Sequence, residues 1–392
     1  MADEPTDGVV VDADSLEQFT ADVLRGAGLA SGAADTVADT LVDANLRGVD
    51  THGVVRLEPY ADRLEAGGIA RDPDLSVSES RAGAAVVDAD DGPGQVATLR
   101  ATDEAVDRAA DAGTAFVGVR NSNHYGTASY YTNHAADRGC IGICMTHSGP
   151  NVAPFGGADP FFGTNPLSIS IPRTDGFHVT LDMATSVVAK GAVILAEEEG
   201  ESIPEEWALD ESGEPTTDPE AFHALRPVGG PKGYGLAFVI DALCGALLDT
   251  AVGEDVATLY DDESAPQGLG HMVAAVDVEA FAERDGYERR IASLVEGLSA
   301  ARPAGGGSTR CSCPANRKPE PARSGWPRES HSVRACGRPS VRSGTGTASP
   351  ARTWRKPSIP SWGSADPAGG QSMLFGKPCG PTEGTTRGTC SG

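Results

Sequence analysis

Residues 115–146 read AFVGVRNSNHYGTASYYTNHAADRGCIGICMT, and this stretch decides the fold class. An apolar run at 115–119 is followed by a helical pattern at 125–138 and a second apolar run at 141–146. This order predicts a strand, a crossover helix and a second strand, which form a βαβ unit of about the minimum length. The first strand ends in the polar loop 121–124, and ligands of open α/β sheets bind at such loops. The sequence therefore predicts an α/β protein with a ligand at this loop.

The flanking sequence predicts further helices and strands. Helices are expected at 15–26, 32–46, 95–111, 186–198, 233–248 and 279–300, and strands at 167–171, 179–183 and 272–278. Ser31 is expected to cap the second helix. The segment Gly26-Ala-Gly28 resembles part of a dinucleotide fingerprint, but it follows a helix rather than a strand. Since no GxGxxG follows a strand elsewhere, a standard Rossmann domain is not expected.

The charge of the chain is strongly negative and unevenly distributed. The 392 residues carry a net charge of −25, to which residues 1–301 contribute −35 and residues 302–392 contribute +10. Such an acidic protein is not expected to bind nucleic acid by neutralising phosphates. Because we find no apolar stretch of about 18 residues and no apolar N-terminal segment, we expect no membrane span, no secretory signal and a cytoplasmic location. The acidity resembles that of proteins from salt-loving organisms, in which salt screens self-repulsion; an ordinary acidic enzyme is the alternative.

Residues 302–392 differ from the rest of the chain in composition as well as in charge. They are rich in Gly, Pro, Ser and Arg, contain five of the eight cysteines, and show no periodicity beyond a few residues. Three interpretations are open: a zinc or disulfide module, a natural disordered tail, and a shifted reading frame in the gene. The spacing that starts at Cys311-x-Cys313 does not match a metal motif, so we expect no metal site. The abrupt change near Arg302 favours the shifted frame.

Two polar clusters contain the residues best suited to proton transfer and carboxylate binding. In the stretch RGVDTHGVVR, His52 is able to exchange a proton near neutral pH, and Thr51 is placed to orient it. Arg56 follows four residues later, and its planar guanidinium suits a carboxylate substrate. The second cluster, NSNHYGTA at 121–128, is able to present backbone N–H groups to a phosphate at a helix start. The structural alternatives are a helix end against which His52 packs, and a satisfied polar turn.

Segments rich in glycine form two further clusters. The third cluster consists of PFGG at 154–157, GTNP at 163–166 and LDMATS at 181–186. These segments allow a close approach of backbone to a ligand, or are ordinary turns between strands. The fourth, GGPKGYG at 229–235, places a lysine at a helix start without forming a P-loop. Lys190 and Lys232 are the only lysines in residues 1–301, which favours a function for both over a solvated face.

Seven motifs in this order resemble the malate/L-lactate dehydrogenase family, which includes L-sulfolactate dehydrogenase, ureidoglycolate dehydrogenase and 2,3-diketo-L-gulonate reductase. The motif not yet quoted is WALD at 207–210 with PTTD at 215–218. The resemblance extends over about residues 15–300. It implies NAD or NADP as cofactor and the interconversion of a 2-hydroxy acid and a 2-oxo acid of the malate, lactate or sulfolactate type. It also implies a non-Rossmann, L-sulfolactate dehydrogenase-like fold and a homodimer with the active site near the subunit interface.

The resemblance further implies roles for individual residues. His52 is implied as the proton donor to the substrate carbonyl, with Thr51 as its relay partner. His124 lies in the cofactor and active-site loop, and in some members the equivalent histidine is the acid/base. Arg56 and Thr164 are implied as substrate contacts. The implied cofactor contacts are His124, Tyr125, Gly126, Thr127, Ala128, Asp182, Met183, Ala184, Lys232 and Gly233.

Two departures from the family pattern keep alternatives open. Some members have a relay aspartate directly after the Lys190-Gly191 pair, and here that residue is Ala192. Members also continue into a strand, a Pro-Gly-Glu-like turn that touches the cofactor and a closing helix, which residues 302–392 do not show. These departures motivate one alternative, a catalytically dead nucleotide-binding protein. A cyclic-imine reductase for piperideine- or pyrroline-2-carboxylate on the same scaffold is a second alternative, which does not depend on them.

The sequence predicts three regions. Residues 1–75 form an N-terminal helical region with the RGVDTHG motif, and residues 76–301 an α/β domain that binds cofactor and substrate. Residues 302–392 form a basic tail that is disordered or frameshifted. If the frame is shifted, the lost segment would have closed the cofactor pocket, and the body would bind cofactor poorly.

Overall fold

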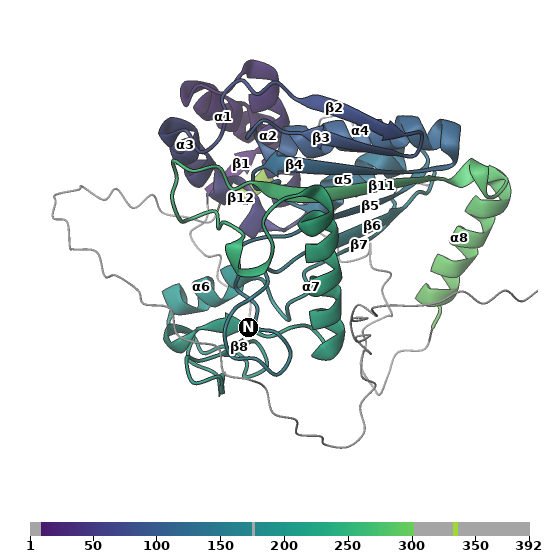
Figure 1. Ribbon diagram of the computed structural model, residues 1–392. Helices are drawn as coiled ribbons and strands as arrows, with labels where there is room; N and C mark the ends of the chain where they lie inside the picture. Colours follow the sequence, from purple (N-terminus) through teal and green to yellow (C-terminus); the bar gives the residue numbers. More distant parts are fainter. Residues whose placement is uncertain (1–8, 175–176, 302–331, 336–392) are drawn as a thin grey trace, which may run out of the picture. The chain divides into compact units, whose positions relative to one another are not determined.

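A seven-stranded mixed sheet forms the centre of the fold (Figure 1). Its strands are β2 (Ser76–Arg81), β3 (Ala84–Asp88), β4 (Thr114–Ser122), β5 (Cys140–Thr146), β6 (Leu167–Ile171), β7 (Val179–Met183) and β11 (Leu269–Asp277). They lie in the order β2-β3-β4-β11-β5-β6-β7, with β3 and β4 parallel and every other neighbouring pair antiparallel. The computed structural model describes residues 9–174, 177–301 and 332–335, and every described element belongs to one unit, residues 1–338.

Helices cover both faces of this sheet. They are α4 (Gly94–Ala112), α5 (Ala128–Asp137) and α7 (Pro231–Cys244), which is followed by the 3-10 turn η4 (Ala246–Leu248). Because side chains alternate along a strand, Val117 of β4 joins the core formed with α4 and α5, whereas its neighbour Gly118 faces the other side. A Cβ on Gly118 would lie 2.2 Å from Leu248 Cδ2, so this glycine allows η4 to approach the strand closely. Ile240 of α7 completes this second core together with Met145 and Met272.

Three N-terminal helices form a separate packed group. They are α1 (Ala13–Gly26), α2 (Ser31–Leu46) and α3 (Leu57–Ala66). Leu24, Leu41 and Leu64, one from each helix, are buried together, and Leu259 from the loop before β11 joins them. Between α2 and α3 the chain makes two 3-10 turns, η1 (Asp50–His52) and η2 (Val54–Arg56). These turns present the RGVDTHG motif between the helices and the sheet domain.

The remaining described elements lie outside the main sheet. They are β1 (Val9–Asp12), α6 (Lys190–Glu199), β8 (Ala208–Leu209), β9 (Pro215–Thr216), η3 (Pro219–Ala221), β10 (Ala224–Leu225), η5 (Gly253–Asp255), η6 (Val278–Ala280), α8 (Arg284–Ser299) and β12 (Ser332–Ala335). Strands β10, β8 and β9 form a small antiparallel sheet. Strand β1 pairs antiparallel with β12.

The predicted α/β class is confirmed, and the predicted βαβ unit is confirmed with one difference. Strands β4 and β5 run parallel, since both are antiparallel to β11, and α5 connects them. They are not neighbours, however, because β11 lies between them. No GxGxxG loop leads from a strand into a helix within the described residues, so the fold differs from a standard Rossmann domain as predicted.

Several predicted boundaries are wrong, and local backbone geometry explains them. The helix expected from Tyr125 begins at Ala128, because Gly126 has a φ of 79° and Thr127 is an extended N-cap. The helix expected from residue 186 begins at Lys190. Ser31 is not a cap: it is the first residue of α2, and the N-cap is Ala30, without a side-chain hydrogen bond.

The expectation about apolar stretches also needs correction. The segment Pro231–Leu248 is long and apolar enough to cross a membrane by length and composition alone. Its residues Ile240, Cys244 and Leu248 are buried against the sheet. Packing against the sheet therefore accounts for part of the apolar composition of this segment, whereas Leu236, Phe238, Val239 and Leu247 remain exposed.

Most of the predictions for residues 302–392 lie outside the described residues. The exception is β12, a strand that the sequence did not predict. The domain boundaries after residues 75 and 301, the disorder and the shifted frame stay predictions.

Candidate active site

The turns between α2 and α3 join His52 and Arg56 through Thr51. Thr51 Oγ1 lies 3.0 Å from His52 Nδ1, and Arg56 Nε donates to the carbonyl oxygen of Thr51 at 2.7 Å. Gly53 lies between the two turns, where a Cβ would approach Asn45 Oδ1 to 2.2 Å. A larger residue at this position would displace the Asn45 side chain, whose Oδ1 accepts the backbone N–H of Val54 at 2.9 Å at the start of the second turn.

The loop after β4 brings His124 against His52. The two imidazole rings stack with centroids 5.7 Å apart and an interplanar angle of 23°. Tyr60 Oη of α3 lies 2.6 Å from His124 Nδ1, and the backbone N–H of His124 donates to Gln267 Oε1 at 3.0 Å. We call His52, Arg56, Tyr60 and His124 the histidine cluster. It unites residues of the N-terminal helices with the loop at the end of β4.

Both histidines of this cluster are held in the neutral form. Burial lowers the pKa of His52 from 6.5 to about 4, and the positive charge of Arg56 adds to the effect. Burial also lowers the pKa of His124, with smaller contributions from His52 and Arg56. Because both pKa values lie below neutral pH, each ring has one nitrogen able to accept a proton or hydrogen bond and one N–H able to donate.

A buried arginine fixes the loop that borders the cluster. The Arg63 guanidinium is 1% exposed and donates to the carbonyl oxygens of Leu259, Asp262 and Ala265. The loop thereby places the Tyr260 ring 5.7 Å from Arg56 Cζ. An aromatic face at this distance attracts a guanidinium and restrains its orientation.

Behind the cluster, a buried histidine links three strands. His271 Nε2 lies 2.9 Å from Ser122 Oγ, and its Nδ1 lies 2.7 Å from Thr146 Oγ1. Burial lowers the pKa of His271 to about 3, so this network is neutral. The Tyr125 ring stacks on His271 with centroids 4.7 Å apart. Tyr125 is therefore part of the core, where it positions the loop of His124.

The structure gives packing roles to several predicted cofactor contacts. Asp182 Oδ2 accepts the backbone N–H of Ser129 at 3.0 Å and so caps the start of α5. This hydrogen bond occupies one of the backbone N–H groups that were expected to face a phosphate. Ala128 is buried, and Thr127 is buried with no hydrogen-bond partner for its Oγ1 in the part of the chain that the structure describes. Met183 is the last residue of β7, Ala184 follows it, and both are partly exposed.

The start of α7 is shaped by backbone contacts. A Cβ on Gly233 would lie 2.4 Å from the carbonyl oxygen of Val228 and 2.7 Å from that of Thr185. Thr185 in turn donates its backbone N–H to the carbonyl oxygen of Thr164 at 2.8 Å. Lys232 is exposed in the first turn of the helix. Thr164, Thr185 and Gly233 thus form one connected region, which we call the glycine region together with Lys232.

Lys190 marks a link between α6 and the histidine cluster. It is the first residue of α6, and its Nζ lies 5.9 Å from the centroid of the Phe222 ring. A Cβ on the next residue, Gly191, would lie 3.1 Å from Thr51 Cγ2. The start of α6 therefore borders the turn that carries His52.

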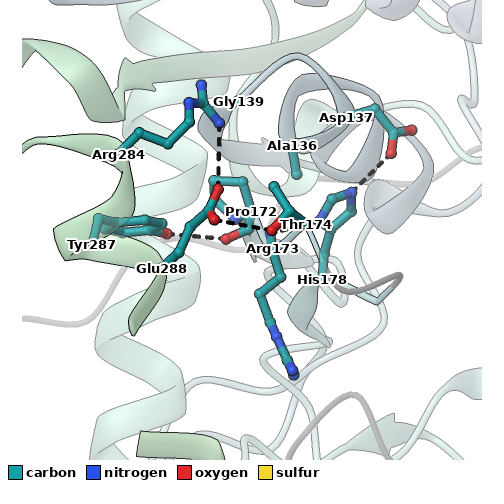
Figure 2. Close-up of a pocket in the computed structure, with 10 residues that line it drawn as sticks. All are labelled: Ala136, Asp137, Gly139, Pro172, Arg173, Thr174, His178, Arg284, Tyr287 and Glu288. Carbon is teal, nitrogen blue, oxygen red and sulfur yellow. Dashed lines mark hydrogen bonds and ion pairs between the residues drawn. The ribbon is translucent and has the colours of Figure 1, made fainter. Parts of the chain in front are cut away.

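A pocket of 340 Å³ lies elsewhere, at the C-terminal end of α5 (Figure 2). Its lining comes from α5, the connection between β6 and β7, and α8, and contains none of the predicted site residues. Charged groups in it are paired: His178 Nε2 lies 2.8 Å from Asp137 Oδ1, and Arg284 lies 4.0 Å from Glu288. The histidine cluster lies at the opposite end of α5, so this pocket is not the candidate active site.

The family described as malate/L-lactate dehydrogenase matches residues 11–320. The chain belongs to this family. It is 41% identical over 293 residues to ureidoglycolate dehydrogenase (NAD(+)) from Escherichia coli, an alignment that covers 75% of this chain and 84% of that protein. The solved structure of sulfolactate dehydrogenase from Methanocaldococcus jannaschii is 33% identical, has a TM-score of 0.74, and matches over 79% of this chain and 89% of that chain.

These findings confirm the predicted enzyme class. The protein is a malate/L-lactate dehydrogenase-family oxidoreductase that uses NAD or NADP and acts on a 2-hydroxy acid; names of its relatives specify NAD(+) and NADP(+). Δ1-Piperideine-2-carboxylate reductase from Pseudomonas syringae is a more distant structural relative, with 26% identity and a TM-score of 0.70 over 78% of this chain and 92% of that chain.

Tyr60 of the cluster and Gln267, which accepts the backbone N–H of His124, were not predicted from the sequence. Tyr60 lies four residues after Arg56, a spacing that places both on one side of a helical turn, so the signal was present. Gln267 precedes β11 in a loop, and nothing in its local sequence distinguishes it from other loop residues.

Proposed function

We propose that the histidine cluster carries out the proton chemistry of 2-hydroxy-acid oxidation and 2-oxo-acid reduction. The observation that supports this most directly is the stacking of His52 on His124 beside Arg56. In this proposal the Arg56 guanidinium binds the substrate carboxylate as a planar fork. Tyr260 restrains that guanidinium from one side.

His52 is proposed as the acid/base. Its neutral ring accepts the hydroxyl proton of the 2-hydroxy acid, and Thr51 stabilises the protonated ring through Nδ1. Bound NAD(P) supplies the hydride acceptor or donor. Burial is the main cause of the low pKa of His52, and the charge of Arg56 is the smaller one. A substrate carboxylate bound to Arg56 would offset that smaller contribution and so favour the protonated ring. His124 donates a hydrogen bond to the same substrate oxygen.

The residues present fit a nicotinamide cofactor. The buried Thr127 hydroxyl lacks a partner among the described residues, and Lys232 stands exposed at the N-terminus of α7, where the helix dipole also favours an anion. We propose that the segment 124–128, Asp182, Met183 and Ala184, and the glycine region form the cofactor site. Within it, Tyr125 and Asp182 hold the loop and the start of α5 in place. Thr164 is assigned to the substrate side of that region.

A screen of 2-oxo acids tests which substrate the enzyme reduces. The purified full chain should oxidise NADH or NADPH in molar KCl with pyruvate, oxaloacetate or sulfopyruvate. Turnover only with a cyclic imine would favour the reductase alternative, which is supported by the structural similarity to Δ1-piperideine-2-carboxylate reductase. Cofactor binding by fluorescence with no turnover of any of these substrates would favour a dead nucleotide-binding protein, the alternative suggested by Ala192.

We further propose a cytoplasmic homodimer that requires salt. Large apolar side chains on α7 and η4 are exposed, and a partner subunit would cover them: Leu236 (40%), Phe238 (47%), Val239 (47%) and Leu247 (64%). The net charge of −35 on residues 1–301 is screened only at high ionic strength. Sedimentation should show a dimer in molar KCl, and Val239→Asp should give a monomer; a wild-type monomer would contradict the proposal.

A further inference from the structure

Tyr60 is hydrogen-bonded to Nδ1 of His124, and the protonation of this nitrogen determines which tautomer of the ring is present. Tyr60 lies in α3, is 3% exposed, and its Oη is 2.6 Å from His124 Nδ1. The backbone N–H of Gly126 also points at this nitrogen, at 3.4 Å. A backbone N–H is only able to donate, so Nδ1 must be an acceptor that carries no proton. The Tyr60 hydroxyl therefore donates to Nδ1 as well, and the ring proton of neutral His124 lies on Nε2.

The surroundings maintain this arrangement. Burial raises the pKa of the Tyr60 phenol, so the hydroxyl keeps its proton, and burial lowers the pKa of His124, so its ring stays neutral. Gln267 is 5% exposed; it accepts the His124 backbone N–H and donates its own backbone N–H to Asn123 Oδ1 at 3.3 Å. Both the backbone and the ring of His124 are thereby fixed by buried partners.

We propose that Tyr60 is a positioning residue that holds His124 as the Nε2–H tautomer, so that His124 acts as a neutral hydrogen-bond donor to the substrate oxygen. This inference rests on the proposed function of the histidine cluster. The inferred tautomer gives His124 and His52 different roles. A neutral imidazole that donates from Nε2 polarises the substrate oxygen without transferring its proton. Proton transfer is then left to His52.

The test combines nitrogen-15 NMR of histidine-labelled full chain in molar KCl with steady-state kinetics. His124→Gln identifies the His124 signals by their loss. In the wild type, Nδ1 of His124 should have the chemical shift of an unprotonated nitrogen and Nε2 that of a protonated one. In Tyr60→Phe the tautomers should mix, and kcat should fall about 5- to 10-fold, the scale of one lost hydrogen bond, with KM changed less than 2-fold.

Tyr130→Phe is the matched control. Its hydroxyl donates to Asp39 of α2 and touches neither histidine of the cluster, so both readouts should stay at wild-type values. A protonated Nδ1 in the wild type, or an unchanged kcat in Tyr60→Phe, would overturn the inference. The NMR result needs no substrate, so it decides the tautomer even if no 2-hydroxy acid is turned over, in which case the proposed function fails separately.

Discussion

The histidine cluster and the glycine region are built in opposite ways. In the cluster, side chains contact one another directly. Tyr60 is hydrogen-bonded to His124, Thr51 is hydrogen-bonded to His52, and the two imidazole rings stack. In the glycine region, backbone carbonyls define the space around Gly233, and the Lys232 side chain stands in solvent. Under the proposed function, the geometry for proton transfer is organised before substrate arrives, whereas the proposed cofactor side offers a shaped backbone and an exposed charge that a bound cofactor would use.

The largest expected effect is that of His52→Ala. Removal of the acid/base should lower kcat by about 100-fold or more, the usual scale of general acid–base catalysis. Steady-state kinetics with saturating cofactor measures it. A full kcat in His52→Ala combined with its loss in His124→Ala would show that the two rings have exchanged roles.

Arg56→Lys should have the next largest effect. A lysine keeps the charge but loses the planar fork and the placement of the guanidinium over the Tyr260 ring, so kcat/KM for a 2-oxo acid should fall about 10- to 100-fold. Substrates without a carboxylate serve as the control and should be affected much less. Equal losses with both kinds of substrate would contradict the assignment of Arg56 to the carboxylate.

Lys232→Ala tests the proposed cofactor role of the glycine region. The variant should weaken cofactor binding about 10-fold, as expected for one charge-assisted contact, while kcat at saturating cofactor changes less than 2-fold. Fluorescence titration of the reduced cofactor measures the affinity, and Lys190→Ala is a comparison variant at the start of α6. Unchanged affinity in Lys232→Ala would remove the lysine from the cofactor site.

The smallest expected effect concerns stability against acid. An unfolded His52 binds a proton below about pH 6.5, whereas the folded protein binds it only near pH 4. The unfolded state therefore takes up this proton first, and stability falls as the pH drops through this window. Between pH 7 and pH 5, the Tm of the wild type should fall by more than that of His52→Gln. Parallel Tm curves would show that His52 is not held neutral by the fold.

Features that depend on local sequence could be predicted, whereas features that depend on tertiary packing could not. Strands β6 and β7 match their predicted bounds because apolar alternation is a local signal. The insertion of β11 between β4 and β5 could not be predicted, because β11 is more than 100 residues away along the chain and pairing partners leave no local trace. Likewise, His52 and Arg56 were found by residue type and spacing, whereas Gln267 and the buried His271 network reach the site only through tertiary packing.

The most direct test of this division is a crossed measurement on His52→Ala and Lys232→Ala, with cofactor affinity and kcat determined for each in molar KCl. The account predicts that His52→Ala binds reduced cofactor with wild-type affinity and loses kcat, while Lys232→Ala loses affinity and keeps kcat. If His52→Ala also loses cofactor affinity, or if Lys232→Ala loses kcat at saturating cofactor, the two regions do not divide proton chemistry from cofactor binding, and the central claim is wrong.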